Sequence, residues 1–207
     1  MTFAENVKCL ISQVIGQFYI PHHLVRSQET KLLHISDTPT TLYPALSNLW
    51  AVLQPEIIVH TGDLADDIKL ELNDDELVNY RRAVVPFLSS LESSGARTIY
   101  IVPGNHDNER IIRSHASRAQ IVSEGSTIQV GQYLLGLAHR FKRLPAGTSY
   151  NLYGHNFRTT RSDNGTIYLN GIHRIHVLLI ESGKVFALPY PWATNTDRKM
   201  VAGIRSI

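Results

Sequence analysis

Residues 98–108 read TIYIVPGNHDN, a short apolar run that leads directly into Gly104-Asn105-His106-Asp107. The β-branched and aromatic residues of Thr98–Val102 predict a β-strand. Turns that follow a strand often contain Gly, Asn or Asp. An amide, an imidazole and a carboxylate in immediate succession are less usual there, and they indicate a site built from side-chain chemistry.

Two earlier segments repeat this arrangement of a strand followed by an acidic residue. The predicted strand Lys31–Ser36 is followed by Asp37, and the predicted strand Glu56–His60 is followed by Gly62 and Asp63. Because ligands bind beyond the carboxyl ends of strands in an open α/β sheet, we expect these carboxylates to lie at one edge.

Helices are expected between these strands. Leu42–Leu53 has a helical pattern and Pro55 stops it, and a longer helix capped by Asn73 or Asp74 reaches about Leu91. The alternation of strand and helix predicts an α/β domain with a parallel sheet.

The second half of the chain contains mostly strand-like segments, and we expect them to build a second sheet. These segments are Ser126–Val130, Tyr133–Ala138, Tyr150–Tyr153, Thr166–Leu169, Arg174–Ile180 and Val185–Leu188. Two of them end at His139 and at Gly154-His155. Five strand ends therefore offer carboxylate, amide and imidazole ligands, a set that suits Mn, Fe, Zn or Ni.

Each of these residues also has an ordinary structural interpretation. An aspartate after a strand commonly serves as a helix cap or turn residue, and a lone histidine such as His139 commonly has a structural role. The order and placement of all five strand ends together favour a metal site, at which an ion can activate water and polarise a phosphoryl oxygen.

The ordered motifs D-x-H, GD, GNHD, H and GHxH resemble those of the calcineurin-like metallophosphoesterase superfamily, over about residues 31–188. The resemblance implies a four-layer αββα sandwich. It implies metal ligation by Asp37, Asp63, Asn105, His139 and His155, with Asp63 shared between two ions. It also implies that His106 is catalytic and that Asp107 orients it.

Two positions depart from the family motifs. Pro39 stands in place of the histidine of D-x-H, and Phe157 stands in place of the second histidine of GHxH. Because both missing histidines serve the same ion in the family, we expect one tightly bound ion, with a second bound weakly or not at all. Substitute ligands are possible at the second position, and the candidates are Asp66, Asp67, His34, His173 and His176. Of these, we expect His34 to be structural and His173 and His176 to lie at the surface.

Length and composition set limits on the class of protein. The chain has 207 residues, of which 43% are hydrophobic and 18% are charged, with ten histidines and a net charge of +2. These values predict one globular domain over residues 31–207, preceded by a helical extension over residues 1–30 with a helix at residues 2–18. The single cysteine Cys9 and the lack of a signal-like or membrane-spanning segment favour a cytoplasmic protein.

Three functions are compatible with these features. The first is a phosphoesterase that acts on a small phosphate ester, with Arg140 and Arg158 near the ligands as candidate phosphate-binding residues. The second is a binding or scaffold protein that keeps the fold with little or no activity, because two ligands are missing. A nuclease is the third and is not expected, since the chain leaves little room for nucleic-acid-binding parts. The N-terminal helix could pack on the domain or mediate self-association.

Overall fold

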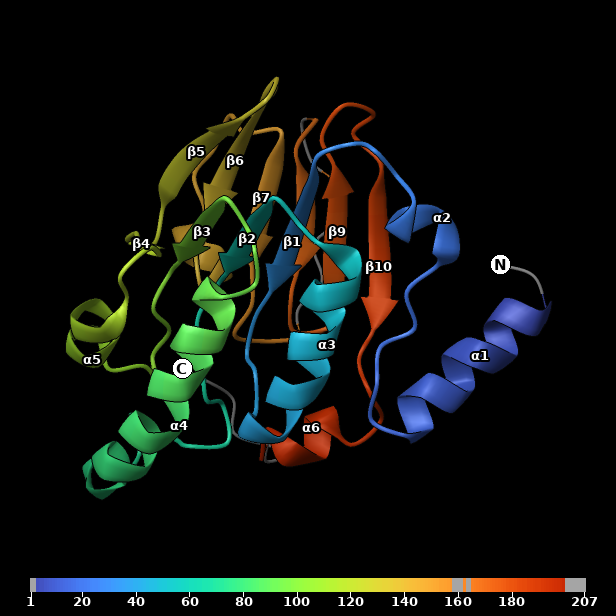
Figure 1. The fold of residues 1–207 in the computed structure, drawn as a ribbon. Helices are drawn as coiled ribbons and strands as arrows, with labels where there is room; N and C mark the ends of the chain where they lie inside the picture. The colour runs from blue at the N-terminus through green and yellow to red at the C-terminus, as the bar shows by residue number, and fades with distance from the viewer. Residues whose placement is uncertain (1–2, 158–161, 163–164, 200–207) are drawn as a thin grey trace.

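The computed structural model describes residues 3–157, 162 and 165–199, which form two β-sheets packed face to face (Figure 1). The first sheet has the spatial order β10 (Val185–Pro189), β9 (Arg174–Leu179), β1 (Lys31–Ile35), β2 (Ile57–His60), β3 (Thr98–Ile101) and β4 (Gln120–Ile121). The second sheet has the order β5 (Ser126–Val130), β6 (Tyr133–Leu137), β7 (Tyr150–Tyr153) and β8 (Ile167–Asn170).

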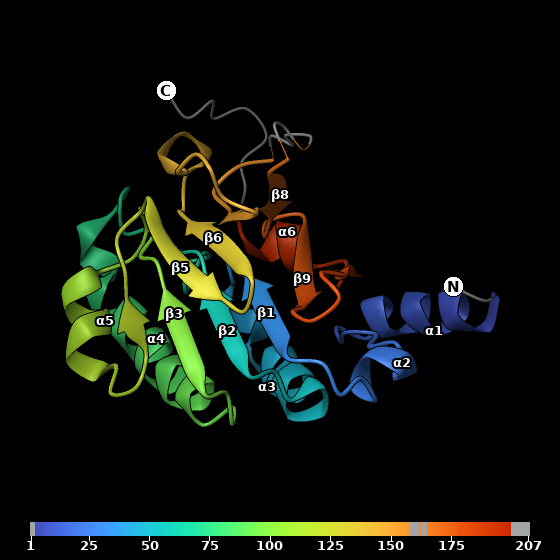
Figure 2. The ribbon, with the colours of Figure 1, turned by 90° about the horizontal axis from the view of Figure 1, so that it is seen from above.

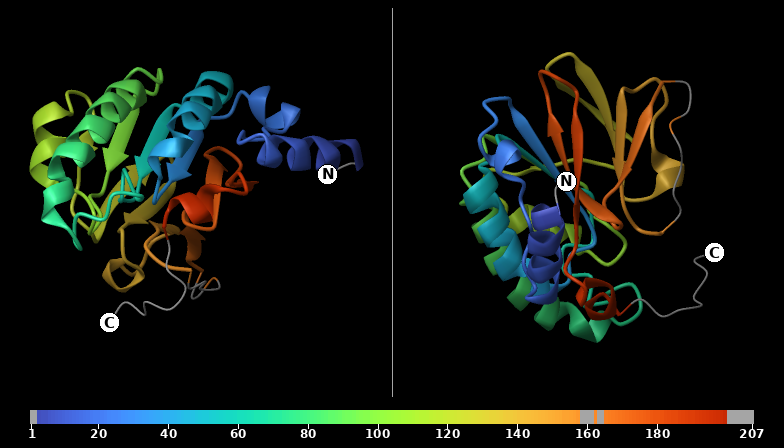
Figure 3. Two further views of the ribbon diagram at one scale, coloured as in Figure 1. Left: turned by 90° about the horizontal axis from the view of Figure 1, so that it is seen from below. Right: turned by 90° about the vertical axis from the view of Figure 1, so that its right-hand side faces the viewer.

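Helices cover the outer face of the first sheet (Figure 2). The α-helices are α1 (Phe3–Val14), α2 (His22–Val25), α3 (Tyr43–Leu53), α4 (Leu77–Glu92), α5 (Glu109–His115) and α6 (Thr194–Asp197). The 3₁₀ helices are η1 (Thr40–Leu42), η2 (Asp74–Glu76) and η3 (Phe141–Arg143). The second sheet lies on the other side of the first sheet from α3 and α4 (Figure 3, right). Phe141 of η3 packs on Tyr153 and Tyr168 of the second sheet. The expected sandwich of two sheets flanked by helices is confirmed.

The predicted strands and helices of the first half are present with small shifts in their ends. Asn73 accepts a hydrogen bond from the backbone N–H of Asp75, so it caps η2, which leads into α4. The helix expected at residues 2–18 is shorter, because Gly16 with φ +76° ends it. Helix α5 and the short strand β4 were not predicted.

The prediction that all later strands belong to the second sheet is wrong for the last two. β9 pairs antiparallel with β1, and β10 pairs with β9, so both belong to the first sheet. The reason lies in β9, which is apolar on both faces. Ile175 and Val177 enter the core beneath the helices, whereas Leu178 enters the core between the sheets. A strand buried on both faces is stable only inside a covered sheet.

The parallel strands β1, β2 and β3 bring their carboxyl ends to one edge of the first sheet. The second sheet also contains parallel pairs, β6 with β7 and β7 with β8. The ends of β6 and β7 are joined to the first sheet at that edge, where His139 Nδ1 lies 2.7 Å from the Thr61 carbonyl oxygen. The two sheets therefore present the ends of five strands, β1, β2, β3, β6 and β7, at one place.

None of the described helices is both long and apolar enough to span a membrane.

Candidate metal centre

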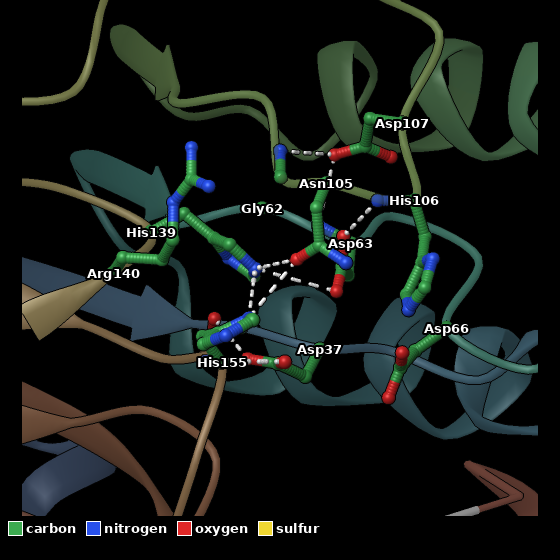
Figure 4. Close-up of polar contacts among 12 residues, drawn as sticks. Asp37, Gly62, Asp63, Asp66, Asn105, His106, Asp107, His139, Arg140 and His155 are labelled. Atoms are coloured by element: carbon green, nitrogen blue, oxygen red, sulfur yellow. Dashed lines mark hydrogen bonds and ion pairs between the residues drawn. The ribbon is translucent and has the colours of Figure 1, made fainter. Parts of the chain in front are cut away.

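Four side chains from four strand ends converge at this edge (Figure 4). Asp63 follows β2, Asn105 follows β3, His139 follows β6 and His155 follows β7. Asp63 and His139 are buried, whereas Asn105 and His155 are half-buried.

The distances between their polar atoms are those of ligands around one cation. Asn105 Oδ1 lies 2.9 Å from His139 Nε2 and 3.0 Å from His155 Nδ1. His139 Nε2 lies 3.1 Å from His155 Nδ1 and 3.3 Å from Asp63 Oδ2. Ligand atoms bound at ~2.1 Å to one ion in tetrahedral or octahedral geometry are separated by ~3.0–3.4 Å. The four residues therefore fit a divalent metal ion.

These atoms are also all capable of donating a lone pair to a cation. His139 Nδ1 can donate to the carbonyl oxygen of Thr61, which leaves Nε2 as a proton acceptor in the neutral ring. Asn105 Nδ2 donates to Glu71 Oε2 at 2.5 Å, so its oxygen faces the histidines. A carboxylate, an amide oxygen and an imidazole nitrogen that face one another repel unless a proton or a cation lies among them.

The pKa values of His139 and Asp63 are both shifted toward the charged forms of these residues. Burial opposes a charge on His139, but the nearby Asp63 carboxylate outweighs burial and raises the pKa of His139 to about 10. Burial likewise opposes a charge on Asp63, but the attraction of His139 and the His106 N–H hold its pKa below the usual range. The surroundings of these atoms therefore stabilise positive charge at this point.

Asp37 lies beside this group. Its carboxylate accepts the backbone N–H of His155, with N–O distances of 3.1 and 3.2 Å, and the hydroxyl of Ser36 at 2.5 Å. Asp37, Asp63 and His155 all have left-handed backbone conformations, with φ of 52°, 55° and 69°. Such conformations cost about 1–3 kcal/mol each in non-glycine residues and cluster at functional sites.

Gly62 allows this edge to close. Its φ is +100°, and a Cβ atom here would lie 2.5 Å from His139 Nδ1 and 2.8 Å from the Gly104 backbone. Only glycine accommodates both the conformation and the close approach.

His106 and Asp107 have separate surroundings. The His106 backbone N–H donates to Asp63 Oδ1 at 2.9 Å, and burial lowers the pKa of its imidazole although Asp63 opposes this. Asp107 accepts hydrogen bonds from the backbone N–H groups of Asp63, Leu64 and Gly104 and from the Tyr80 hydroxyl. The described hydrogen bonds include none from His106 to Asp107. The Asp107 carboxylate instead holds together the backbone of the turns that carry Asp63 and Asn105, and its role in orienting His106 stays a prediction.

Comparison with known proteins identifies the family. A family model described as calcineurin-like phosphoesterase matches residues 30–199. The chain belongs to this family. The solved structure of YfcE, a phosphoesterase from E. coli, is 17% identical with a TM-score of 0.53, and the match covers 78% of this chain and 100% of that one. A second solved structure is 12% identical with a TM-score of 0.59, and the match covers 79% and 100% of the two chains. At these identities the two structures show the fold alone. A search of curated proteins finds no match.

This calcineurin-like phosphoesterase departs from the family motifs at two places. Pro39 is buried at the start of η1, whereas Phe157 is exposed and its ring contacts that of His173. Neither residue has a side-chain atom that can bind a metal.

Asp66 is the only candidate substitute ligand that lies within a group of metal-type donors formed by described residues. Asp63, Asp66 and His106 offer atoms within 4.8 Å of one another. Asp67 instead accepts the backbone N–H and hydroxyl of Thr40, and so caps η1. These bonds account for Asp67 as a structural residue.

The three candidate histidines lie apart from the centre. His34 is fully buried, bonds Thr61 Oγ1 at 2.9 Å and stacks on His176. His173 bonds the Phe157 carbonyl oxygen at 2.8 Å. The prediction that His176 lies at the surface is wrong. It is buried because its strand, β9, lies inside the first sheet rather than in an exposed hairpin.

Of the two candidate phosphate-binding arginines, the structure describes Arg140. Arg140 lies near His139, but its guanidinium is paired with Glu124, with Nη2 2.7 Å from Oε2. Arg158 lies outside the described residues.

Sequence reasoning missed several residues of the centre. Thr61 acts through its backbone carbonyl, so its side chain gives no signal. Glu71, which positions Asn105, and Lys69, which pairs with Asp66, lie in the irregular segment after β2. Asp66 and Lys69 are three residues apart, a spacing that predicts an ion pair if the segment forms a helical turn.

Proposed function

We propose that the chain is a metal-dependent phosphoesterase that hydrolyses a small phosphate ester, with a phosphodiester as the first choice. The observation that carries this proposal is the group of four converging atoms from Asp63, Asn105, His139 and His155. Mn, Fe, Ni and Zn are the candidate ions, since nitrogen and oxygen ligands suit them. When bound, such an ion would polarise a phosphoryl oxygen and lower the pKa of a bound water.

The protein residues would contribute orientation and proton transfer. Asn105 and His139 are already fixed, by Glu71 and by the Thr61 carbonyl, so little reorganisation is needed on binding. His106 lies next to Asp63 and is half-buried, a position from which its imidazole could exchange a proton with the leaving oxygen. Arg140 could bind a phosphate oxygen by sharing its guanidinium with Glu124.

The direct test is turnover of a chromogenic phosphodiester and a chromogenic phosphomonoester. The assay should use Mn, Ni, Fe, Co and Zn, each at several pH values. Metal-dependent hydrolysis that is lost in His106→Ala, with folding and metal content intact, supports the proposal. No hydrolysis under any of these conditions contradicts it.

A second candidate is a binding or scaffold protein on the same fold. The observation that favours it is the absence of metal-binding side chains at Pro39 and Phe157. The same His106→Ala variant separates the two functions. The scaffold function is supported if the wild type shows no turnover and His106→Ala binds a partner of the wild type equally well.

A further inference from the structure

A second group of metal-type donors lies next to the first. Asp63, Asp66 and His106 offer one ligand atom each, and these atoms lie within 4.8 Å of one another. Asp63 belongs to both groups, and both carboxylates are only 2% exposed. Two buried carboxylates so close together require compensating positive charge.

Lys69 already supplies positive charge to this second group. Its ammonium forms an ion pair with Asp66 Oδ1, and the Lys69 side chain is 22% exposed whereas that of Asp66 is 3% exposed. Burial, together with repulsion from Asp63 and Asp37, raises the pKa of Asp66, and Lys69 opposes this rise. A buried Asp66 carboxylate without a cationic partner would destabilise the folded protein, and the ion pair with Lys69 avoids this cost.

We propose that the Lys69 ammonium takes the place of a second divalent cation at Asp63, Asp66 and His106. The proposal rests on the proposed function. The chain would then combine one metal ion with one fixed ammonium beside His106. An ammonium has three N–H donors, and those not used by Asp66 can bind a phosphate oxygen as a point charge. It cannot acidify water as a metal ion does, so Lys69 would position substrate rather than activate the nucleophile.

The test counts bound ions. Purified protein is saturated with Mn²⁺, freed of weakly held metal and analysed by elemental mass spectrometry, with calorimetric titration for weaker sites. We expect one ion in the wild type. We expect a second, weaker ion in Lys69→Gln, because the Asp66 carboxylate becomes available. Lys69→Arg, the matched control, retains the charge and should hold one ion. The double variant Asp66→Asn with Lys69→Gln should also return to one.

Each outcome has one meaning. Two ions in the wild type, one of which is lost in Asp66→Asn, overturn the role of Lys69 while leaving the first metal site intact. One ion in a folded Lys69→Gln protein overturns it as well. No ion in the wild type overturns the proposed function itself. In turnover, Lys69→Gln should raise KM at low Mn²⁺, and excess Mn²⁺ should lower it again. Excess Mn²⁺ should not lower KM in the double variant.

A separate observation concerns α1, which lies at the edge of the molecule (Figures 1 and 3). Its half-buried residues are the polar or small Glu5, Cys9, Ser12 and Gln13. Gln13 binds the body of the protein, through its side chain to the Tyr190 carbonyl and through its own carbonyl to the Trp192 N–H. The helix therefore presents its polar side to the domain, the reverse of an ordinary surface helix.

The apolar side of α1 faces outward. Its exposed residues are Phe3, Val7, Leu10, Ile11 and Val14, and Ile15 follows directly after the helix. Trp192, which is 62% exposed, lies beside the last turn. At ~60–120 Å² per large apolar side chain, this surface amounts to on the order of 500 Å². A standard dimer interface buries about 800 Å² per partner, a little over half of it apolar.

We infer that this surface binds a second copy of the chain about a two-fold axis. Phe3, Val7, Leu10 and Val14 are spaced by four, three and four residues, the spacing of a helix–helix seam. A two-fold pair brings identical stripes together and so covers both. A membrane surface is disfavoured as the partner, because α1 carries one basic residue, Lys8, and one acidic residue, Glu5, rather than a basic face.

Sedimentation velocity and light scattering test this inference. We expect a dimer for the wild type, a monomer for Leu10→Glu and a dimer for Asn6→Glu. The Asn6→Glu control adds the same charge at an exposed position outside the stripe. Metal content should not change in any of the three. A monomeric wild type at about 100 μM overturns the inference, and so does flotation of the wild type with vesicles of phosphatidylserine and phosphatidylcholine.

Discussion

His155 Nδ1 lies 3.1 Å from His139 Nε2, and Asn105 Oδ1 lies about as close to both nitrogens. The two rings are tilted at 70°, so they meet at their nitrogen-bearing edges rather than stack. The His139 ring can satisfy its other nitrogen at Thr61, which leaves its Nε2 directed at its neighbours. Such an arrangement is typical of side chains that bind one metal ion.

Removal of either histidine should abolish tight metal binding. Loss of a residue that only orients a metal ligand typically costs about 10–100-fold in metal affinity, and loss of a ligand itself should cost more. We therefore expect His139→Ala and His155→Ala to lose Mn²⁺ affinity by more than about 100-fold in calorimetric titration. His173→Ala is the control, because His173 bonds the Phe157 carbonyl outside the centre. Equal losses in all three variants would contradict the assignment.

Asp107→Asn should weaken both stability and metal binding. The carboxylate accepts four hydrogen bonds, and an amide would direct its NH₂ group at one or more of these donors. We expect a loss of about 2–4 kcal/mol in the free energy of unfolding and a fall in metal affinity of about 10–100-fold. Tyr80→Phe removes one donor only and should cost about 1 kcal/mol. Denaturant unfolding measures the stability of both variants, and calorimetric titration measures metal affinity. An Asp107→Asn protein with unchanged stability and metal affinity would contradict the role of this carboxylate in holding the two turns together.

Gly62→Ala should disrupt the centre. The added methyl would lie 2.5 Å from His139 Nδ1 and would also strain a backbone with φ +100°. Gly147→Ala separates these effects. Gly147 has φ +75° and no neighbouring atoms within 4 Å of an added Cβ, so only the conformational cost of about 1–2 kcal/mol applies. We expect metal binding to be lost in Gly62→Ala and retained in Gly147→Ala. Retention in both would show that the close approach is tolerated.

Acid should destabilise the protein through His176. Burial, with smaller effects of His173 and Arg174, lowers the pKa of this histidine to about 4. The unfolded chain binds a proton near pH 6.5 and the folded chain only near pH 4. Stability is therefore fully present above pH 6.5 and falls as the pH drops through that window, by on the order of 3 kcal/mol. Denaturant unfolding at pH 7.5 and pH 4.5 measures the difference.

His176→Leu is the matched variant, since it keeps an apolar side chain at the buried position. Its free energy of unfolding should fall less steeply between these two pH values. The same pH slope in both proteins would show that another group is responsible.

The sequence was sufficient to predict which candidate ligands come together, but not which residues surround them. Asp63, Asn105, His139 and His155 each lie within four residues of the end of a strand, so the ends of the parallel strands place them at one edge. The backbone contacts of Asp107 were not predicted, because the sequence shows only that its neighbour is His106. The turn directs its carboxylate away, toward backbone N–H groups that no sequence pattern reports.

The position of β9 shows a different limit. Its apolar run was recognised as a strand, but pairing partners depend on the burial of both faces. Only the packed structure shows Val177 and Leu178 entering different cores. The buried state of His176 follows from that position and was missed with it. The outward apolar face of α1 was visible as periodicity, but periodicity does not state which face meets the domain.

The most direct test of the central claim is to locate the ion itself. Crystals of protein loaded with Mn²⁺ are measured on both sides of the manganese absorption edge. We predict one strong anomalous peak bound by Asp63, Asn105, His139 and His155. No peak at these four side chains, or a peak held by other residues, would contradict the account.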